Sequence, residues 1–345
     1  MSNYGYVNAR LRAQHSRLLA AKDYEELLSL PDLEAMARWL ETSQYARDWQ
    51  LARTRRDGLE AVEEALESNF SAAAGKALRM AEGQTRLLLG AVLRRWDLQN
   101  LMAVMRGVHQ GWSGEDIGRR LWPVGGYDAA RLGELCRQPG MKQLADTLAT
   151  WRDDFAEPLT AGLAAYLKDR DLPALELGLL RHYYRRTLGT LRGPGQSRGL
   201  LRTLVRDEVD LHNAKAAWRL LQKTGLKPGE AMAHFIEGGE RLNRRTYLEL
   251  FDPRTRRRAM SSLRGTPYRA LLAQGDSLLE AEGELGRASS RRLDRLYRGD
   301  PLAAGLMIGF LWRKFHEVAN LRLLARAKVF GPGPEKLRPE LLIFS

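Results

Sequence analysis

Two sequence landmarks recur three times each along this chain, and an internal repeat constrains a fold more tightly than composition does. The first landmark is an acid, two residues and an asparagine, with an arginine six residues after the asparagine. Its copies are Asp97, Asn100 and Arg106; Asp210, Asn213 and Arg219; and Glu317, Asn320 and Arg326. The acids are 113 and 107 residues apart, which indicates a unit of roughly 110 residues.

The second landmark is Glu-Leu with a proline shortly after it and a leucine thirteen residues after the first leucine. Its copies are Glu26-Leu27 with Pro31 and Leu40, Glu134-Leu135 with Pro139 and Leu148, and Glu249-Leu250 with Pro253 and Leu263. These pairs are 108 and 115 residues apart, so both landmarks have nearly the same period. The sequence therefore predicts three similar units in series.

The fold class predicted from hydrophobic spacing is all-α. Apolar residues recur at intervals of three and four, and alternation with β-branched residues is scarce. Combined with the repeat, this pattern predicts three helical domains at residues 1–112, 113–226 and 227–345. We expect three such units to lie about a pseudo-threefold axis.

Cysteine content and hydrophobic runs narrow the class of protein. Cys136 is the only cysteine, so an intrachain disulfide is excluded and a reducing compartment is expected. The first residues lack the apolar segment of a secretory signal. The uncharged run from Leu302 to Trp312 is eleven residues long, whereas a spanning helix needs about 20. We therefore expect a chain that lies at a membrane or away from it, without crossing it.

The formal net charge is +13, and 55 residues are lysine or arginine. This charge has two interpretations: an arginine-rich solvated surface, or a surface for phosphate groups. A helical-repeat scaffold that binds nucleic acid is the alternative function, and its affinity would fall steeply as salt rises.

The repeated acid and asparagine share the apolar stripe of their helix when the sequence is placed at about 100° per residue. An unpaired buried carboxylate would cost several kcal/mol. We therefore expect these side chains to act as hydrogen-bonded structural pins between helices. The six predicted pins are Asp97, Asn100, Asp210, Asn213, Glu317 and Asn320.

The repeated arginines lie about 180° from the acids on the same helices. They are expected to face solvent, and Arg106, Arg219 and Arg326 are candidates for binding a common partner. Three unrelated solvated arginines would give the same pattern.

Catalytic motifs are missing from the sequence. His316-Glu317 begins a zinc-peptidase pattern, but Asn320 stands where the second histidine ligand is required. Gly75-Lys76 is followed by Ala77, so it does not make a phosphate-binding loop. We predict no catalytic residue, no cofactor, no metal and no small-molecule substrate.

The most specific segments resemble a known family. Tyr4 to Arg10 (YGYVNAR), the repeated acid-x-x-Asn and Phe315 to Arg322 (FHEVANLR) are similar to the C subunit of the V/A-type ATPase or ATP synthase, the counterpart of the d subunit in the eukaryotic vacuolar enzyme. The resemblance runs the full length, and the middle repeat is the loosest part.

This resemblance implies a function that periodicity alone does not. The family forms a funnel of three helical domains that connects the central stalk, with its D- and F-type subunits, to the membrane proteolipid ring. It transmits torque without catalysis of its own, in proton- or sodium-coupled ATP synthesis or hydrolysis. The expected location is cytoplasmic, attached peripherally to the inner face of the membrane through the rotor ring, and no nucleic acid is expected as a partner.

Overall fold

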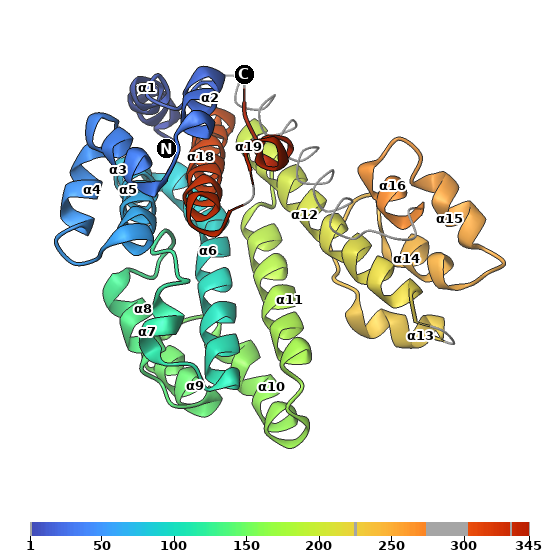
Figure 1. Cartoon of the computed structure of the whole chain (residues 1–345). Helices are drawn as coiled ribbons and strands as arrows, with labels where there is room; N and C mark the ends of the chain where they lie inside the picture. The colour runs from blue at the N-terminus through green and yellow to red at the C-terminus, as the bar shows by residue number, and fades with distance from the viewer. Residues whose placement is uncertain (1, 224–225, 274–302, 332, 345) are drawn as a thin grey trace. The chain divides into compact units, whose positions relative to one another are not determined.

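The computed structural model describes residues 2–223, 226–273, 303–331 and 333–344. Helices connected by turns make up this part of the chain, and its one β feature is an isolated bridge between Ser2 and Gly83 (Figure 1). The predicted all-α class is confirmed. None of the helices in the described ranges is long and apolar enough to cross a membrane.

The described helices differ widely in length, from four to 28 residues. In chain order they are α1 (Tyr4–His15), α2 (Ala21–Ser29), α3 (Leu33–Thr42), α4 (Ala46–Ala52), α5 (Gly58–Met80), α6 (Gly83–Gln110), α7 (Gly114–Gly118), α8 (Ala129–Cys136), α9 (Met141–Thr150), α10 (Ala156–Asp169), α11 (Leu172–Thr190), α12 (Gln196–Leu221), α13 (Pro228–Ala231), α14 (Arg244–Phe251), α15 (Arg256–Ser262), α16 (Pro267–Ala273), α18 (Ala304–Phe330) and α19 (Pro334–Leu337). Short 3₁₀ turns follow α13 and α19.

The chain divides into two compact units. Unit 1 combines Met1–Leu89 with Arg287–Ser345, and unit 2 is Gly90–Gly286. Unit 1 therefore contains both ends of the sequence. The three-domain division at 112 and 226 stays a prediction, and residues 274–302 of its third part lie outside the described residues.

The order of helices recurs along the chain. Each of the long helices α6, α12 and α18 carries one acid-x-x-Asn motif and is followed by a short helix, which is α7, α13 or α19 respectively. The Glu-Leu landmarks lie in α2, α8 and α14, and each landmark proline precedes the next helix, which is α3, α9 or α15. This recurrence is what a triplicated unit predicts.

The core of unit 1 forms where α5 packs against α18 (Figure 1). Along α5 the buried residues recur at spacings of three and four, as one face of a helix requires. They are Ala61, Val62, Ala65, Leu66, Phe70, Ala74 and Ala77. The first helix, α1, also packs against α18, and the side-chain amide of Asn8 donates to the carbonyl of Ala303 at 2.9 Å. The two ends of the chain are thus built into one core.

The core of unit 2 includes a cluster where α12 meets α14 and α16. Aromatic rings fill this space: the ring centroid of Tyr247 lies 4.9 Å from that of Phe235 and 5.2 Å from that of Phe251. Small residues on α12, Ala214 and Ala217, let the aromatic layer approach the helix closely.

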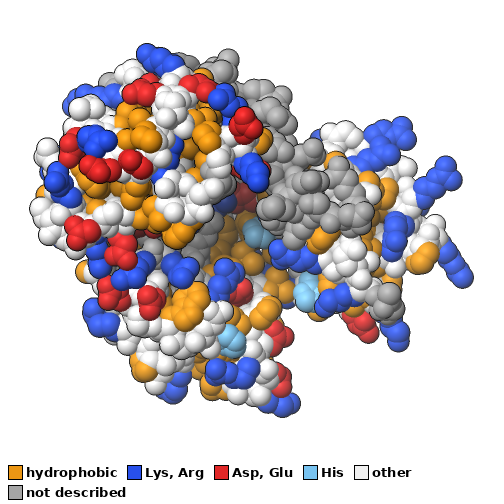
Figure 2. Space-filling model, in the orientation of Figure 1, with side chains coloured by type: hydrophobic (Ala, Val, Ile, Leu, Met, Phe, Trp, Pro, Cys, Tyr) orange, Lys and Arg blue, Asp and Glu red, His pale blue; other side chains and the backbone are white. Residues whose placement is uncertain are grey.

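Surface charge differs between the parts of the molecule. On the face in Figure 2, acidic and basic side chains are mixed over α2 to α5, whereas basic side chains predominate over α14 to α16.

Partial burial perturbs the pKa of Glu67, an acidic side chain on α5. Burial raises the pKa of Glu67 to about 8; Arg322 on α18 opposes the rise, while Glu64 and Glu63 add to it. A glutamate in the unfolded chain titrates near its ordinary pKa. Between that pKa and about 8, the folded chain therefore keeps a proton on Glu67 that the unfolded chain has lost. Folding stability should therefore fall as the pH rises through this window.

We predict that Glu67→Gln raises the melting temperature relative to the parent chain at about pH 9 and has a smaller effect at about pH 5. Glutamine removes the buried charge that forms as Glu67 ionises. Thermal unfolding at both pH values measures this, with Glu34→Gln on the exposed face of α3 as the control. An equal shift at both pH values would show that ionisation of Glu67 does not contribute.

Candidate functional site

The three repeated asparagines make the same pair of hydrogen bonds with the backbone of the segment that follows their helix. Each side-chain oxygen accepts from a backbone N–H, and each side-chain nitrogen donates to the carbonyl of that same residue. The respective distances are 2.8 and 2.6 Å for Asn100 with Trp122, 2.8 and 2.8 Å for Asn213 with Ile236, and 3.1 and 2.9 Å for Asn320 with Leu342. Each amide therefore fixes one residue of the following segment on the long helix.

Asp97 holds the loop after α6. Its carboxylate accepts from the backbone N–H groups of Gly126 and Tyr127 at 2.8 and 2.9 Å, and from Arg94 at 3.0 Å. Burial raises the pKa of Asp97, and Arg94 and the two N–H groups oppose that rise. The side chain is fully buried, so these donors replace the water that a surface carboxylate would bind.

Asp210 holds the equivalent loop after α12 by backbone contacts. It accepts from Glu240, Arg241 and Leu242 at 3.2, 2.7 and 3.0 Å. Burial raises the pKa of Asp210, and the three N–H groups oppose the rise. Asp210 is thus stabilised by three backbone N–H groups, whereas Asp97 is stabilised by two backbone N–H groups and the guanidinium of Arg94.

Glu317 makes the corresponding contacts with the start of the chain. Its carboxylate accepts from the backbone N–H of Leu19 at 2.6 Å, the hydroxyl of Tyr45 at 2.5 Å and the amide of Gln44 at 2.9 Å. The ammonium of Lys314 donates to it at 2.8 Å. Burial lowers the pKa of Lys314 and Glu317 opposes this, while burial followed by the charge of Glu317 raises the pKa of Tyr45.

Glycines make room for two of the carboxylates. A Cβ added to Gly125 would lie 2.3 Å from Oδ1 of Asp97, and one added to Gly239 would lie 2.1 Å from Oδ1 of Asp210. Both distances are far below van der Waals contact, so each loop needs glycine where its backbone meets the acid. The Gly-Gly pairs at 125–126 and 238–239 are a sequence signal of these loops that lies outside the two landmarks.

The three repeated arginines are exposed at the surface. Arg106 makes an ion pair with Glu176 of α11, at 2.6 and 3.0 Å, and Arg326 pairs with Glu63 of α5 at 2.6 Å. Two of the three thus have a glutamate on a neighbouring helix within their own unit. The partner-binding role of Arg106, Arg219 and Arg326 stays a prediction.

Several residues of these sites lie outside the two sequence landmarks. Arg94 also contacts Asp153 and Asp154, and its guanidinium lies 4.3 Å from the ring centroid of Phe155. Tyr45 and Lys314 are 269 residues apart in sequence and meet at 2.9 Å. Arg94 and Lys314 each stand three residues before the acid of their motif, so this cation recurs in two of the three copies. The middle copy has Asp207 at that position, so the cation belongs to neither landmark.

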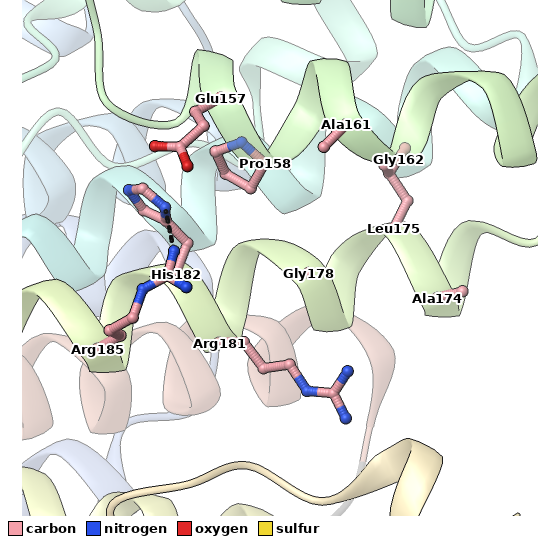
Figure 3. A pocket seen from close by; sticks show the side chains of 10 residues that line it. All are labelled: Glu157, Pro158, Ala161, Gly162, Ala174, Leu175, Gly178, Arg181, His182 and Arg185. Atoms are coloured by element: carbon pink, nitrogen blue, oxygen red, sulfur yellow. Dashed lines mark hydrogen bonds between the residues drawn. The ribbon is translucent and has the colours of Figure 1, made fainter.

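One hollow in unit 2 has a volume of about 390 Å³ and lies between α10 and α11 (Figure 3). Gly162 and Gly178 contribute to its wall, and Glu157, Arg181, His182 and Arg185 supply its polar groups. Arg181 donates to the carbonyls of Ala233 and Phe235, and Arg185 contacts Nδ1 of His182 at 3.3 Å. No serine, threonine or cysteine is among the described residues that line it.

Metal ligands do not gather in the described ranges, which contain no group of three or more histidine, cysteine, aspartate or glutamate side chains placed to hold a metal ion. His316, which begins the imperfect zinc motif, packs its ring 4.9 Å from that of Trp312 and 5.6 Å from that of Phe344.

Comparison with known proteins identifies the class to which this arrangement belongs. The sequence profile of a family of rotary ATP synthase subunits, described as the ATP synthase (C/AC39) subunit, matches residues 7–340. The chain belongs to this family, and the resemblance inferred from the sequence motifs is confirmed. The family assignment agrees with the expectation of a subunit without catalytic activity of its own.

Curated relatives match nearly the whole chain. The C subunit of the A-type ATP synthase from Methanococcoides burtonii is 28% identical, with 99% of this chain and 95% of that protein covered. The proteins of the same name from Haloquadratum walsbyi and Halobacterium salinarum are 27% and 29% identical, with 99% of this chain and 99% and 98% of theirs covered.

We predict that replacing one anchoring acid with alanine lowers the free energy of unfolding substantially. Asp97 has a partly buried cationic partner, Arg94, and Glu317 a buried one, Lys314. The expected loss for each is about 3 to 5 kcal/mol. For Asp210 the loss comes from three N–H donors, at roughly 1 to 3 kcal/mol for each donor that water does not reach. Chemical denaturation of the single variants measures these losses.

Two further variants make this test specific. Asp146→Ala removes an exposed carboxylate that pairs with Lys142, so it should cost less than about 1 kcal/mol. Gly239→Ala leaves Asp210 in place but puts a methyl group against its carboxylate, and it should destabilise the chain as well. Equal losses for Asp146→Ala and Asp210→Ala would contradict the anchoring role.

Proposed function

We propose that this chain is the non-catalytic adaptor of the central rotor in a V/A-type ATPase or ATP synthase. In this role it connects the central stalk to the proteolipid ring in the membrane and transmits torque between them. The observation that carries the proposal is the family match over residues 7–340. Relatives named as C subunits of A-type ATP synthases, covered along almost their full length, support it.

The buried anchors support a mechanical role. A part that transmits torque has to resist relative sliding and twisting of its helices under load. Apolar packing alone is non-directional, whereas a hydrogen bond holds its two groups at a set distance and angle. Six buried polar side chains that fix loops on the three long helices would give the chain this resistance.

The proposed partners follow from this role. Subunits of the D and F types would form the stalk contact, and the hydrophobic proteolipid would form the ring contact. The chain would lie at the inner face of the membrane and be held there through the ring. The recurrence of the acid and asparagine contacts further supports three similar units. Their arrangement about a pseudo-threefold axis, as a funnel, is part of the proposal and rests on the family alone.

We predict that the tagged chain copurifies from detergent-solubilised membranes with a small, very hydrophobic proteolipid and two soluble stalk subunits. Mass spectrometry of the eluate identifies them, and the tag fused to an unrelated protein is the control. The isolated chain should neither bind nor hydrolyse ATP. Robust ATPase activity of the purified chain alone would refute the adaptor role.

The repeated arginines are proposed contacts for the stalk or the ring. Each lies at the same position in its repeat and is exposed. An asymmetric stalk cannot contact three equivalent positions equally, so one or two of them should dominate. The ion pairs of Arg106 and Arg326 hold their guanidinium groups near the helix surface, where they remain accessible to a partner.

We predict that Arg106→Gln/Arg219→Gln/Arg326→Gln weakens assembly and leaves the chain folded. Each exposed ion pair lost costs about 0.2 to 1 kcal/mol. The loss of assembly should shrink at high salt, because exposed charges are then already screened. Affinity for the purified stalk subunits or ring, at low and high salt, measures this effect.

A matched variant separates position from net charge. Arg12→Gln/Arg47→Gln/Arg137→Gln also removes three exposed arginines and should assemble like the parent chain. Normal affinity of the first triple variant at low salt would reject the three arginines as contacts. Unfolding of that variant would assign them to the core of the chain.

A further inference from the structure

The helices α14 to α16 of unit 2 present a concentration of exposed arginine (Figure 2). Between Arg244 and Ala273 there are eight arginines and two acidic residues, Glu249 and Asp252. Five of the eight have an exposed guanidinium with neither an ion pair nor a side-chain hydrogen bond to the rest of the described residues. These five form what we call the basic surface: Arg254, Arg257, Arg258, Arg264 and Arg269.

The fold does not require this charge. The helices α2 to α4 and α8 to α10 hold the same places in the order of elements as α14 to α16. Ala21–Ala52 contains three basic and seven acidic residues, and Ala129–Asp169 contains five basic and six acidic residues. Three segments of similar order thus carry net charges of −4, −1 and +6. We therefore attribute the positive charge to a partner that binds this surface.

The other three arginines of the segment each have an acidic side chain or a backbone carbonyl as a partner. Arg245 pairs with Glu249 at 2.9 Å, Arg244 approaches Glu237 at 4.0 Å, and Arg256 donates to the carbonyl of Leu250 at 2.7 Å. The five arginines of the basic surface are left to repel one another in water. Mutual repulsion is a cost that an anionic partner would remove.

The apolar groups of the segment are turned inward. Tyr247, Phe251 and Tyr268 are buried, and none of the large exposed hydrophobic side chains of the described residues lies between Arg244 and Ala273. Protein interfaces rely on aromatic or aliphatic anchors at their centre, and single-stranded nucleic acid is bound by stacking on exposed rings. The basic surface offers neither. It fits a partner recognised by charge over an extended area.

We propose that the basic surface docks on an anionic phospholipid layer, with its guanidinium groups bound to headgroup phosphates. A guanidinium donates two parallel hydrogen bonds to a phosphate. Arg257 and Arg258 on α15, Arg269 on α16, and Arg254 and Arg264 in the adjoining turns have long side chains that reach phosphates without a shaped pocket. The contact is electrostatic and reversible, since no large apolar side chain of this described segment is available to insert. It requires no other subunit, so it is tested apart from the adaptor role.

The experiment is cosedimentation of the purified full chain with vesicles of phosphatidylcholine alone or mixed with phosphatidylglycerol. The chain should bind the mixed vesicles at low salt, release at high salt and ignore the neutral vesicles. Arg254→Gln/Arg257→Gln/Arg258→Gln should reduce binding about a hundredfold, since each arginine near an anionic surface contributes roughly fivefold. The melting temperature should stay unchanged because the three side chains are exposed.

The matched control is Arg12→Gln/Arg47→Gln/Arg137→Gln, which removes the same charge from other exposed positions. It should keep most of the vesicle binding. Equal losses in the two triple variants would overturn the proposal, because net charge alone would then explain binding. Absence of binding to mixed vesicles would overturn it too, as would tighter binding to duplex DNA at the same salt. If the parent chain does not bind vesicles and the Arg254→Gln/Arg257→Gln/Arg258→Gln variant loses its copurifying subunits, the basic surface binds an acidic protein instead.

Discussion

A carboxylate buried in a long helix, facing the backbone N–H groups of the loop that returns to that helix, is the interaction on which the described structure depends. At Asp97 and Asp210 the loop arrives about 30 residues later and presents two or three N–H groups. A buried acid without these donors would be strongly unfavourable, so only one docking of the loop satisfies it. The asparagine three residues on fixes the same loop at a second point, so the loop can neither slide along the helix nor rotate about it.

Glu317, the third buried acid, makes the same kind of contact between segments that are far apart in the sequence. The donors to Glu317 come from Leu19, Gln44 and Tyr45, near the start of the chain. Lys328 also joins the two ends of the sequence, because its ammonium donates to the carbonyls of Leu28 and Leu30 at the end of α2. Folding of unit 1 therefore requires helices from both ends of the sequence, and these helices stabilise each other.

The sequence predicted the fold class and the placement of the anchors because both depend on side-chain periodicity. Hydrophobic spacing identified the helices, and the helical wheel placed Asp97, Asp210 and Glu317 on apolar faces, where the structure buries them. The partners could not be predicted in the same way. Trp122, Ile236 and Leu342 occupy the same place with three different side chains, because the contact uses only their backbone.

Tertiary ion pairs were beyond sequence reasoning for a related reason. The helical wheel placed Arg106 and Arg326 away from the core, and both are exposed. Their partners, Glu176 and Glu63, lie 70 and 263 residues away, on helices whose rotation is set by packing. Local periodicity contains no information on that rotation. The two compact units likewise depend on which helices pack together, and unit 1 joins segments from the two ends of the sequence.

Backbone-directed anchoring also explains how segments of similar order can differ so much in surface charge. If docking depended on side-chain ion pairs, a change in charge would disturb the fold. Backbone N–H and C=O groups make most of the contacts at Asp97, Asp210 and the three asparagines, so these contacts place few demands on the exposed side chains of α2 to α4, α8 to α10 and α14 to α16. Their net charges of −4, −1 and +6 can then differ according to the binding partner of each surface. A chain built of similar units gains distinct surfaces in this way, while the buried acid and asparagine recur on each of its three long helices.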